Sequence, residues 1–169
     1  MTANTTGRTV SKWLTFVLDD VGGTLRSIPI NSINGLGLEF PAKDITAWQD
    51  AVHGSLPETP SCTIEIEGPL TIDALQTVAA GISGSHLTLA PIQAAGGVQT
   101  SGVPLTIDVR CGMRHAWEAD EPQFGITGSA SNGFWLSSYV PDWNNSTYKA
   151  TFEVYAGSDA PAWGTAAES

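Results

Sequence analysis

Hydrophobic and polar residues alternate along several short runs of this chain, which is the pattern of half-buried β-strands. The clearest run is residues 61–67 (SCTIEIE), where Glu65 and Glu67 share the polar face because successive side chains point to opposite sides of a strand. Residues 104–113 (PLTIDVRCGM) alternate in the same way and put Asp108 on their polar face. Further strands are expected at residues 13–18, 24–30, 33–40, 86–90, 133–140 and 147–155.

A β-hairpin is predicted near the N-terminus. Residues 13–26 (WLTFVLDDVGGTLR) contain two apolar runs on either side of a turn-forming centre. That centre holds Asp19, Asp20, Gly22 and Gly23, and its glycines supply the positive φ angles that tight loops need.

One segment, residues 71–81 (TIDALQTVAAG), has the period of an amphipathic helix. Thr71 can cap its N-terminus and Gly81 can close its C-terminus. About seven strands with one helix predict a mainly β fold, an antiparallel β-sandwich or curled sheet with one flanking α-helix. The expected apolar stripe of the helix is Ile72, Leu75, Val78 and Ala79.

The length fits a single domain over residues 1–169. Polar residues 1–11 are expected to form a flexible N-terminal arm, and residues 156–169 a loosely held C-terminal tail. Residues 41–60 are bounded by prolines and show no sustained period, so we expect a long loop of the kind that carries function. Residues 91–103 are predicted to be a Gly-rich connection.

The chain is acidic, with 17 Asp and Glu residues against 7 Lys and Arg residues and a formal charge of −10. Nucleic-acid binding needs clustered Lys and Arg, so DNA near this protein is expected to be repelled. No apolar run of about 18 residues and no signal-peptide pattern occurs, so neither a membrane span nor secretion is expected. Cys62 and Cys111 are expected to be buried free thiols rather than a disulfide, which fits a reducing compartment.

Catalytic and metal-binding patterns are weak. One acidic segment holds the densest group of possible metal ligands, but ligands usually converge from several fixed elements, so a solvated turn is favoured. Glu65 and Glu67 could be imagined as paired catalytic acids, yet an exposed strand face explains them more simply. P-loop, G-x-S-x-G and G-x-G-x-x-G patterns are absent, so neither enzymatic activity nor a cofactor is expected. The acidic group is His115, Glu118, Asp120 and Glu121.

Three tryptophans fall on predicted loops or on the tail: Trp48, Trp143 and Trp163. Aromatic anchors dominate the energetics of protein interfaces, so these residues favour self-assembly. For His53, in the 41–60 loop, a role at an interface or in solvent is favoured over one as a base. The alternative that each indole packs onto its own subunit stays open.

Residues 16–26 (FVLDDVGGTLR) resemble the early hairpin of major tail tube proteins from long, flexible-tailed bacteriophages, in which an apolar run precedes D-D-S-G-G-T-L-R-D-I-S. Val21 and Ser27 stand where that family has Ser and Asp. Further similarities follow in order: a loop, an alternating strand that ends in Glu67 and Gly68, a helix, and two late strands before a short tail.

The resemblance implies β-sandwich-like subunits that form a homo-oligomeric ring, expected to be hexameric, and rings that stack into a hollow tube. DNA would pass through this tube during ejection without specific binding, and other tail proteins would bind the tube ends. The protein would lie in the virion tail after synthesis in the host bacterial cytoplasm, with no membrane partner.

The resemblance also implies site residues. The hairpin turn with Asp19, Asp20, Gly22 and Gly23 would be an assembly element, and the 41–60 loop would reach an adjacent ring. Subunit contacts are expected at Trp48, His53, Trp143 and Trp163. The lumen is expected to be lined by Glu65, Glu67 and Asp108, whose like charge would let DNA slide.

Two alternatives remain from the sequence. A capsid decoration protein would use the same arms and exposed tryptophans to clamp shell subunits, but it would not stack. A carbohydrate-binding β-sandwich would stack sugar rings on Trp48, Trp143 and Trp163.

Overall fold

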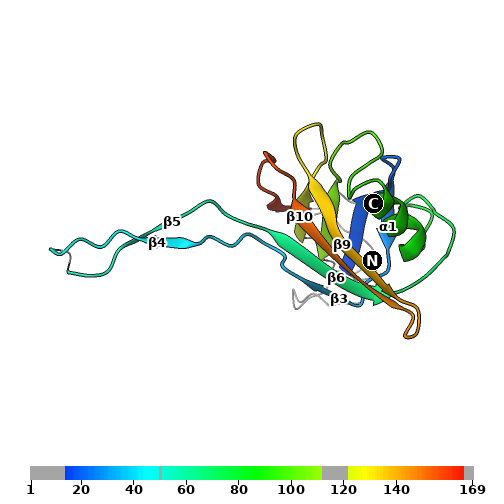
Figure 1. Cartoon of the computed structure of the whole chain (residues 1–169), viewed down its shortest axis with the longest axis horizontal. Coiled ribbons are helices and arrows are strands. Elements are labelled where there is room, and N and C mark those ends of the chain that lie inside the picture. The colour runs from blue at the N-terminus through cyan, green and yellow to red at the C-terminus, as the bar shows by residue number, and fades with distance from the viewer. Residues whose placement is uncertain (1–13, 50, 112–121, 166–169) are drawn as a thin grey trace.

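A computed structural model of the chain describes residues 14–49, 51–111 and 122–165. In this part of the chain, two packed sheets form a body from which a long hairpin projects (Figure 1). The elements are β1 (Leu14–Asp19), β2 (Leu25–Ile28), β3 (Ser32–Asn34), β4 (Ala42–Asp44), β5 (Ser55–Pro57), β6 (Thr63–Pro69), α1 (Ser85–Ala94), β7 (Ile107–Cys111), β8 (Pro122–Ile126), β9 (Phe134–Asp142), β10 (Thr147–Val154) and β11 (Ala162–Thr165).

The first sheet has five strands in the order β11-β8-β7-β1-β2, and each neighbouring pair is antiparallel. Phe16 of β1 lies opposite Ile28 of β2 and Val109 of β7, and all three side chains are buried. The predicted N-terminal hairpin is confirmed, since β1 and β2 pair directly around the turn.

The second sheet has four strands in the order β3-β6-β10-β9 and is also antiparallel. Ile66 of β6 lies opposite Ile33 of β3 and Ala150 of β10. Along β6 the apolar residues are buried while Glu65 and Glu67 are exposed, so the alternation seen in the sequence is confirmed.

The hydrophobic core lies between the two sheets. The rings of Phe16 and Phe152, one from each sheet, have their centroids 5.6 Å apart. Tyr148 is buried in the second sheet, and its hydroxyl donates to the carbonyl of Pro29 at 2.7 Å, so the polar end of this core side chain has a partner. The mainly β fold with one helix, predicted from the sequence, is confirmed.

The helix predicted at residues 71–81 is wrong, because this segment is irregular apart from one turn. Its backbone bonds to residues that follow it in the chain. The N–H of Gln76 donates to Ser83 Oγ at 2.9 Å, and that hydroxyl donates back to the Gln76 carbonyl at 3.0 Å. The N–H of Gly84 donates to the carbonyl of Asp73 at 3.1 Å. These contacts satisfy the backbone without a helix.

Helix α1 occupies residues 85–94 instead, so the strand predicted at 86–90 is also wrong. The short run alternates apolar and polar residues, which favours a strand from sequence alone. In the fold, Leu89 and Ile92 lie at helical spacing and are both fully buried, and α1 packs against β9. The free energy gained by burying these two side chains outweighs the weak local preference of this run for a strand.

Four strands were not predicted from the sequence, namely β4, β5, β8 and β11. The described part of the 156–169 tail contains β11, which pairs with β8 and puts Trp163 opposite Phe124. Residues 162–165 of the tail are therefore tied to the five-stranded sheet through this pairing.

The strand predicted at 33–40 is also shorter than expected. Only its beginning belongs to β3, because Gly35 and Gly37 take φ angles of 84° and 114° that end the extended backbone. The N-terminal arm predicted at residues 1–11 lies outside the described residues.

Candidate assembly surfaces

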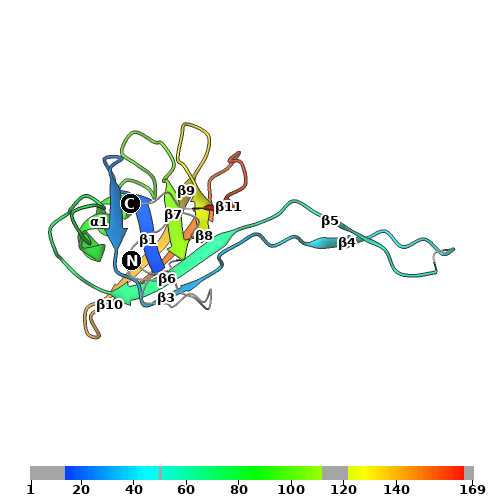
Figure 2. The same cartoon turned by 180° about the vertical axis from the view of Figure 1, so that it is seen from behind.

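The loop predicted at residues 41–60 is a two-stranded hairpin that projects from the body (Figures 1 and 2). Lys43 of β4 lies opposite Leu56 of β5, and a bridge between Glu39 and Ser61 closes the root of the hairpin. We call the described residues between 39 and 61 the arm. An extended hairpin of this kind can reach a neighbouring molecule.

The arm carries apolar side chains that remain exposed. Trp48, near its tip, is fully exposed, and His53 is exposed as well. A two-stranded hairpin is at best marginally stable alone, and exposed aromatic and aliphatic groups typically mark protein interfaces. The arm is therefore the strongest candidate for contact with another chain. Its exposed large apolar residues are Phe40, Ile45, Trp48, Val52 and Leu56.

The β1–β2 turn is held by Asp20. Its Oδ1 accepts the backbone N–H groups of Gly22 and Thr24, both at 2.9 Å, and its Oδ2 accepts Arg26 Nε at 2.9 Å. Gly23 has a φ of 90°, as the sequence predicted for a glycine in this turn. The Asp20 carboxylate thus links the two sides of the turn within one subunit.

Asp19 connects the turn to the rest of the sheet. Its Oδ2 accepts the backbone N–H of Thr106 at 2.8 Å and Gln99 Nε2 at 3.1 Å. Burial raises the pKa of Asp19, while the hydrogen bonds from Thr106 and Gln99 partly oppose the rise.

The sequence predicts a subunit contact at this turn, and the bonds that Asp19 and Asp20 already make limit which atoms could take part in it. Asp19 and Asp20 are only 6% and 7% exposed, and both bond within their own subunit. Gly22 and Gly23 are exposed. A neighbour at this turn would therefore meet the glycine backbone rather than free carboxylates.

The outer face of the four-stranded sheet is mainly polar, and its charged side chains are mostly acidic. Glu65 and Glu67 of β6 and Glu153 of β10 project from it, and Lys149 Nζ lies 3.4 Å from Glu67 Oε1. Both members of this pair are more than half exposed, so the pair contributes little stability. Asp108 belongs to β7 of the other sheet, so the three residues expected in the lumen do not share one surface.

Trp143 and Trp163 are each partly packed on their own subunit. Trp143 lies in the turn between β9 and β10, and His86 contacts it edge-on with ring centroids 5.0 Å apart. Trp163 packs on Phe124 at 4.9 Å, and both indoles remain more than half exposed. Each keeps a free surface for a further contact.

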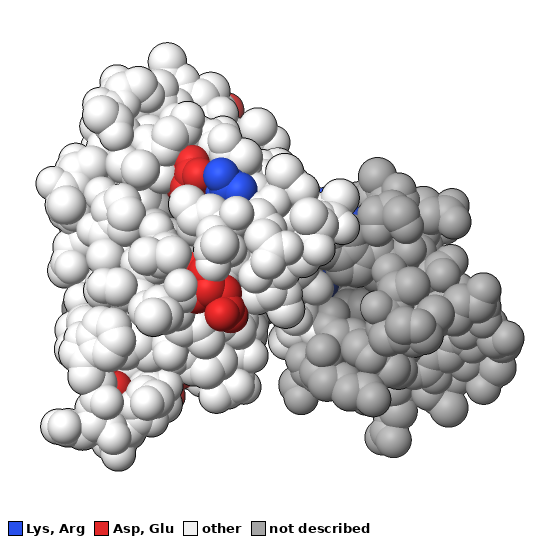
Figure 3. All heavy atoms as spheres, turned by 90° about the vertical axis from the view of Figure 1, so that its right-hand side faces the viewer, with Lys and Arg blue, Asp and Glu red and all other residues white. Residues whose placement is uncertain are grey.

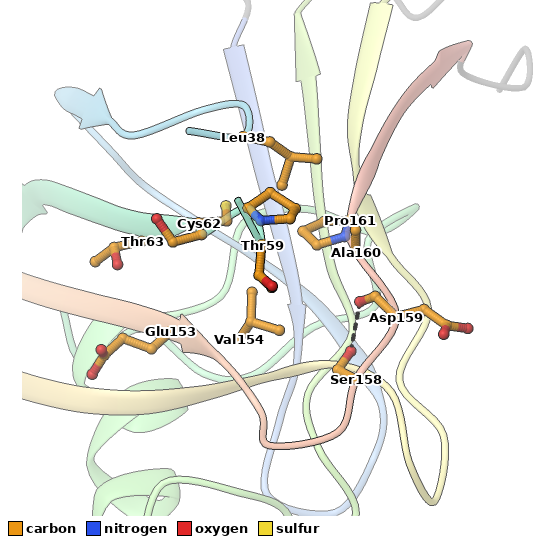
Figure 4. A pocket seen from close by; sticks show the side chains of 12 residues that line it. Leu38, Thr59, Cys62, Thr63, Glu153, Val154, Ser158, Asp159, Ala160 and Pro161 are labelled. Carbon is orange, nitrogen blue, oxygen red and sulfur yellow. Dashed lines mark hydrogen bonds between the residues drawn. The ribbon is translucent and has the colours of Figure 1, made fainter. Parts of the chain in front are cut away.

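A groove of about 550 Å³ lies at the root of the arm (Figure 4). Leu38 and Cys62 line it on the arm side, with Val154 and Pro161 across from them. Burial, with the charge of Glu39 adding to it, raises the pKa of Cys62 to about 11, so this thiol is protonated near neutral pH. Cys62 and Cys111 are both free, with Cys111 partly exposed.

The described residues contain neither a group of metal ligands nor a membrane-spanning helix. Among the described residues, no three His, Cys, Asp or Glu side chains are grouped as a metal site requires. The acidic group with His115, Glu118, Asp120 and Glu121 lies outside the described residues. Within the described part of the chain, no helix has the length and hydrophobicity needed to span a bilayer.

Several large assemblies contain subunits with this architecture. The chain is similar to a subunit in the tube-terminating cap of the anti-feeding prophage, with 11% identity over 98% of this chain and 97% of that one and a TM-score of 0.61. It is also similar to a subunit in the virion of a native gene transfer agent, with 13% identity, 93% and 99% coverage, and a TM-score of 0.56.

A third similar subunit comes from the extended sheath-tube complex of an extracellular contractile injection system, PVC. Its identity is 12%, the coverage is 98% of this chain and 100% of that one, and the TM-score is 0.57. No protein-family model and no curated protein matches the sequence. At these identities the similarity concerns the fold, and the chain has the fold of tail-tube-like proteins.

Proposed function

We propose that the chain is the subunit of a phage tail tube, which forms rings that stack into a hollow tube for the passage of DNA. The arm is the observation that best supports this proposal, because it exposes apolar side chains well outside the body of its own subunit. The partner would be further copies of the same chain, with other tail proteins at the tube ends. The tube would lie in the virion tail after synthesis in the host bacterial cytoplasm.

Contacts within a ring would join sheet edges. The four-stranded sheet has β3 and β9 at its two edges, and among the described residues β3 has no further strand partner. The start of β9 is already covered, because Phe134 pairs with Leu105 and Leu136 N–H donates to the Gly97 carbonyl. Pairing β3 of one subunit with the later residues of β9 in the next would join the sheets into a barrel around a lumen. A hexameric ring is the proposed closed form.

The polar face of the four-stranded sheet would then line the lumen. Glu65, Glu67 and Glu153 outnumber Lys149 on this face, so the wall would carry negative charge. Phosphates of passing DNA would be repelled rather than bound, because binding requires Lys and Arg. Asp108 lies on the other sheet and is left out of the proposed lumen.

The similar subunits belong to tubes, to a tube cap and to a gene transfer agent virion, and this supports an origin in a phage-like tail. Open sheet edges and the arm favour a stacking subunit over a capsid decoration protein. A sugar-binding module would not need either feature.

Electron microscopy of the purified chain, with light scattering over a range of concentrations, tests the proposal. Rings or tubes with a central hole are the expected result. Monomers or discrete trimers at every concentration would contradict it and favour the decoration protein instead.

A further inference from the structure

We infer that the arm of one subunit docks on an apolar surface at the opposite end of a second copy, in the next ring. This inference rests on the proposed tube. The receiving surface, which we call the far-end patch, consists of Ile72, Leu75, Ile82, Leu87 and Trp143, all at least 38% exposed.

The far-end patch is built from three segments held together by hydrogen bonds. The segment before α1 is tied to the helix start, where Ser85 N–H donates to Thr71 Oγ1 and His86 N–H donates to the Thr71 carbonyl, both at 3.0 Å. His86 in turn contacts Trp143 and lies 2.8 Å from the Tyr139 hydroxyl through its Nδ1. The indole is therefore held in place before any partner arrives.

The segment before α1 exposes apolar side chains that its sequence pattern would place in the core. Ile72 and Leu75 belong to a stripe that would normally be buried, yet Ile72 is 67% exposed. The segment is not loose, because Ser83 is fully buried and bonds to both backbone groups of Gln76. Fixed apolar side chains that no element of the described chain covers fit a surface that a partner covers.

The two exposed apolar surfaces lie at opposite ends of the molecule (Figures 1 and 2). The arm projects from one end of the body, whereas the segment before α1 and the β9–β10 turn lie at the other. A contact between two different surfaces of identical chains is heterologous, and it propagates along an axis instead of closing into a dimer. That is the geometry required for stacked rings.

Charge complementarity does not drive this pairing. The end of the body that faces away from the arm is largely uncharged in its described part (Figure 3). Its segments carry the carboxylates of Asp73 and Asp142, and hydrogen bonds from Asn145 and Asn144 lower the pKa of Asp142. Residues 41–60 contain Lys43 but also Asp44, Asp50 and Glu58, so the proposed contact rests on apolar side chains rather than on charge.

Hydrogen exchange on the unmodified chain, compared between tubes and dissociated subunits, is the first test. Amides of residues 71–84 and of the arm should both exchange at least about tenfold more slowly in tubes. Slowing in the arm alone would overturn the inference, since the arm would then dock elsewhere. If the unmodified chain forms no tubes, the proposed function itself has failed.

Cysteine cross-linking identifies the partner. Tubes of the Trp48→Cys, Ile82→Cys double variant, or of Val52→Cys, Leu75→Cys, should give a ladder of covalent multimers on non-reducing gels. Cys111→Ser is included in these variants and in the control, so that each chain carries one donor and one acceptor thiol besides the buried Cys62. The matched control Trp48→Cys, Leu25→Cys places its second thiol on exposed Leu25 of β2, outside the patch, and should give no ladder.

The cross-linking outcomes separate the possible occupants. Tubes without a ladder from either double variant would overturn the docking site while leaving the tube proposal intact. Mass-spectrometric links from the patch to residues 1–13 would assign it to the N-terminal segment and likewise overturn the inference. If neither double variant assembles, the exchange measurement on the unmodified chain decides.

Discussion

Arg26 Nε donates to Asp20 Oδ2 at 2.9 Å, across the turn that joins β1 to β2. The other oxygen of Asp20 accepts two backbone N–H groups of the same turn. Both side chains of the ion pair are mostly buried, so the pair differs from a surface salt bridge. The D-D-x-G-G pattern, which resembles the early hairpin of tail tube proteins, thus has a structural role inside one subunit.

Asp20→Ala should lower the free energy of unfolding by about 3 kcal/mol, because it leaves two turn amides and a buried guanidinium without their acceptor. Urea denaturation of the unassembled subunit measures the change. Asp73→Ala is the matched control, an exposed aspartate whose substitution should change stability by less than about 0.5 kcal/mol. Equal effects of the two substitutions would contradict the role given to Asp20.

Asp19→Asn should change how stability depends on pH. The folded-state pKa of Asp19 lies above its ordinary value of 3.8, so the folded chain holds the proton more tightly than the unfolded chain. Its contribution to stability is therefore fully present below pH 3.8 and is lost as the pH rises through the folded-state pKa.

The variant lacks this titration, so its stability relative to the unmodified chain should improve between pH 3.5 and pH 7, measured by urea denaturation at both values. Asparagine keeps an acceptor for Thr106 N–H, so the fold should persist. Parallel pH dependence of the two proteins would show that Asp19 does not titrate in this way.

Ser83→Ala should destabilise the segment before α1 by about 2 kcal/mol, since the N–H and carbonyl of Gln76 both lose their partner at a partly buried site. Faster hydrogen exchange across residues 72–84 should accompany the loss. Ser101→Ala, at an exposed serine, is the matched control and should leave both measurements unchanged. Unchanged exchange in Ser83→Ala would mean that other contacts hold this segment.

Glu65→Lys with Glu67→Lys should slow the release of DNA from assembled particles, because the lumen would then attract phosphates. Asp108→Lys makes the same change of charge per residue on the other sheet and should leave the rate unaltered, once microscopy has established that tubes form. Normal release by the double variant would remove the electrostatic role proposed for the polar face. Slowed release by Asp108→Lys would place the lumen on the other sheet.

Local pattern in the sequence was enough to predict some of these features. Residues 61–67 alternate so regularly that the exposed faces of Glu65 and Glu67 follow directly, and the paired glycines after Asp20 predict the hairpin turn. The arm could be predicted only as a functional loop, since its exposed apolar residues have no period and its strands are three residues each. Ile72 and Leu75 were expected in the core, so the far-end patch was missed.

The sequence by itself determined the mainly β class, the N-terminal hairpin and the alternation of the main strands, because these depend on neighbouring residues along the chain. Only the tertiary structure decided where the helix lies and which faces meet. Residues 71–81 have the better helical pattern, yet the buried hydroxyls of Ser83 and Ser85 accept backbone N–H groups of that segment, while Leu89 and Ile92 fill the core from α1. Long-range burial and hydrogen bonding outweighed a local preference of less than about 1 kcal/mol per residue.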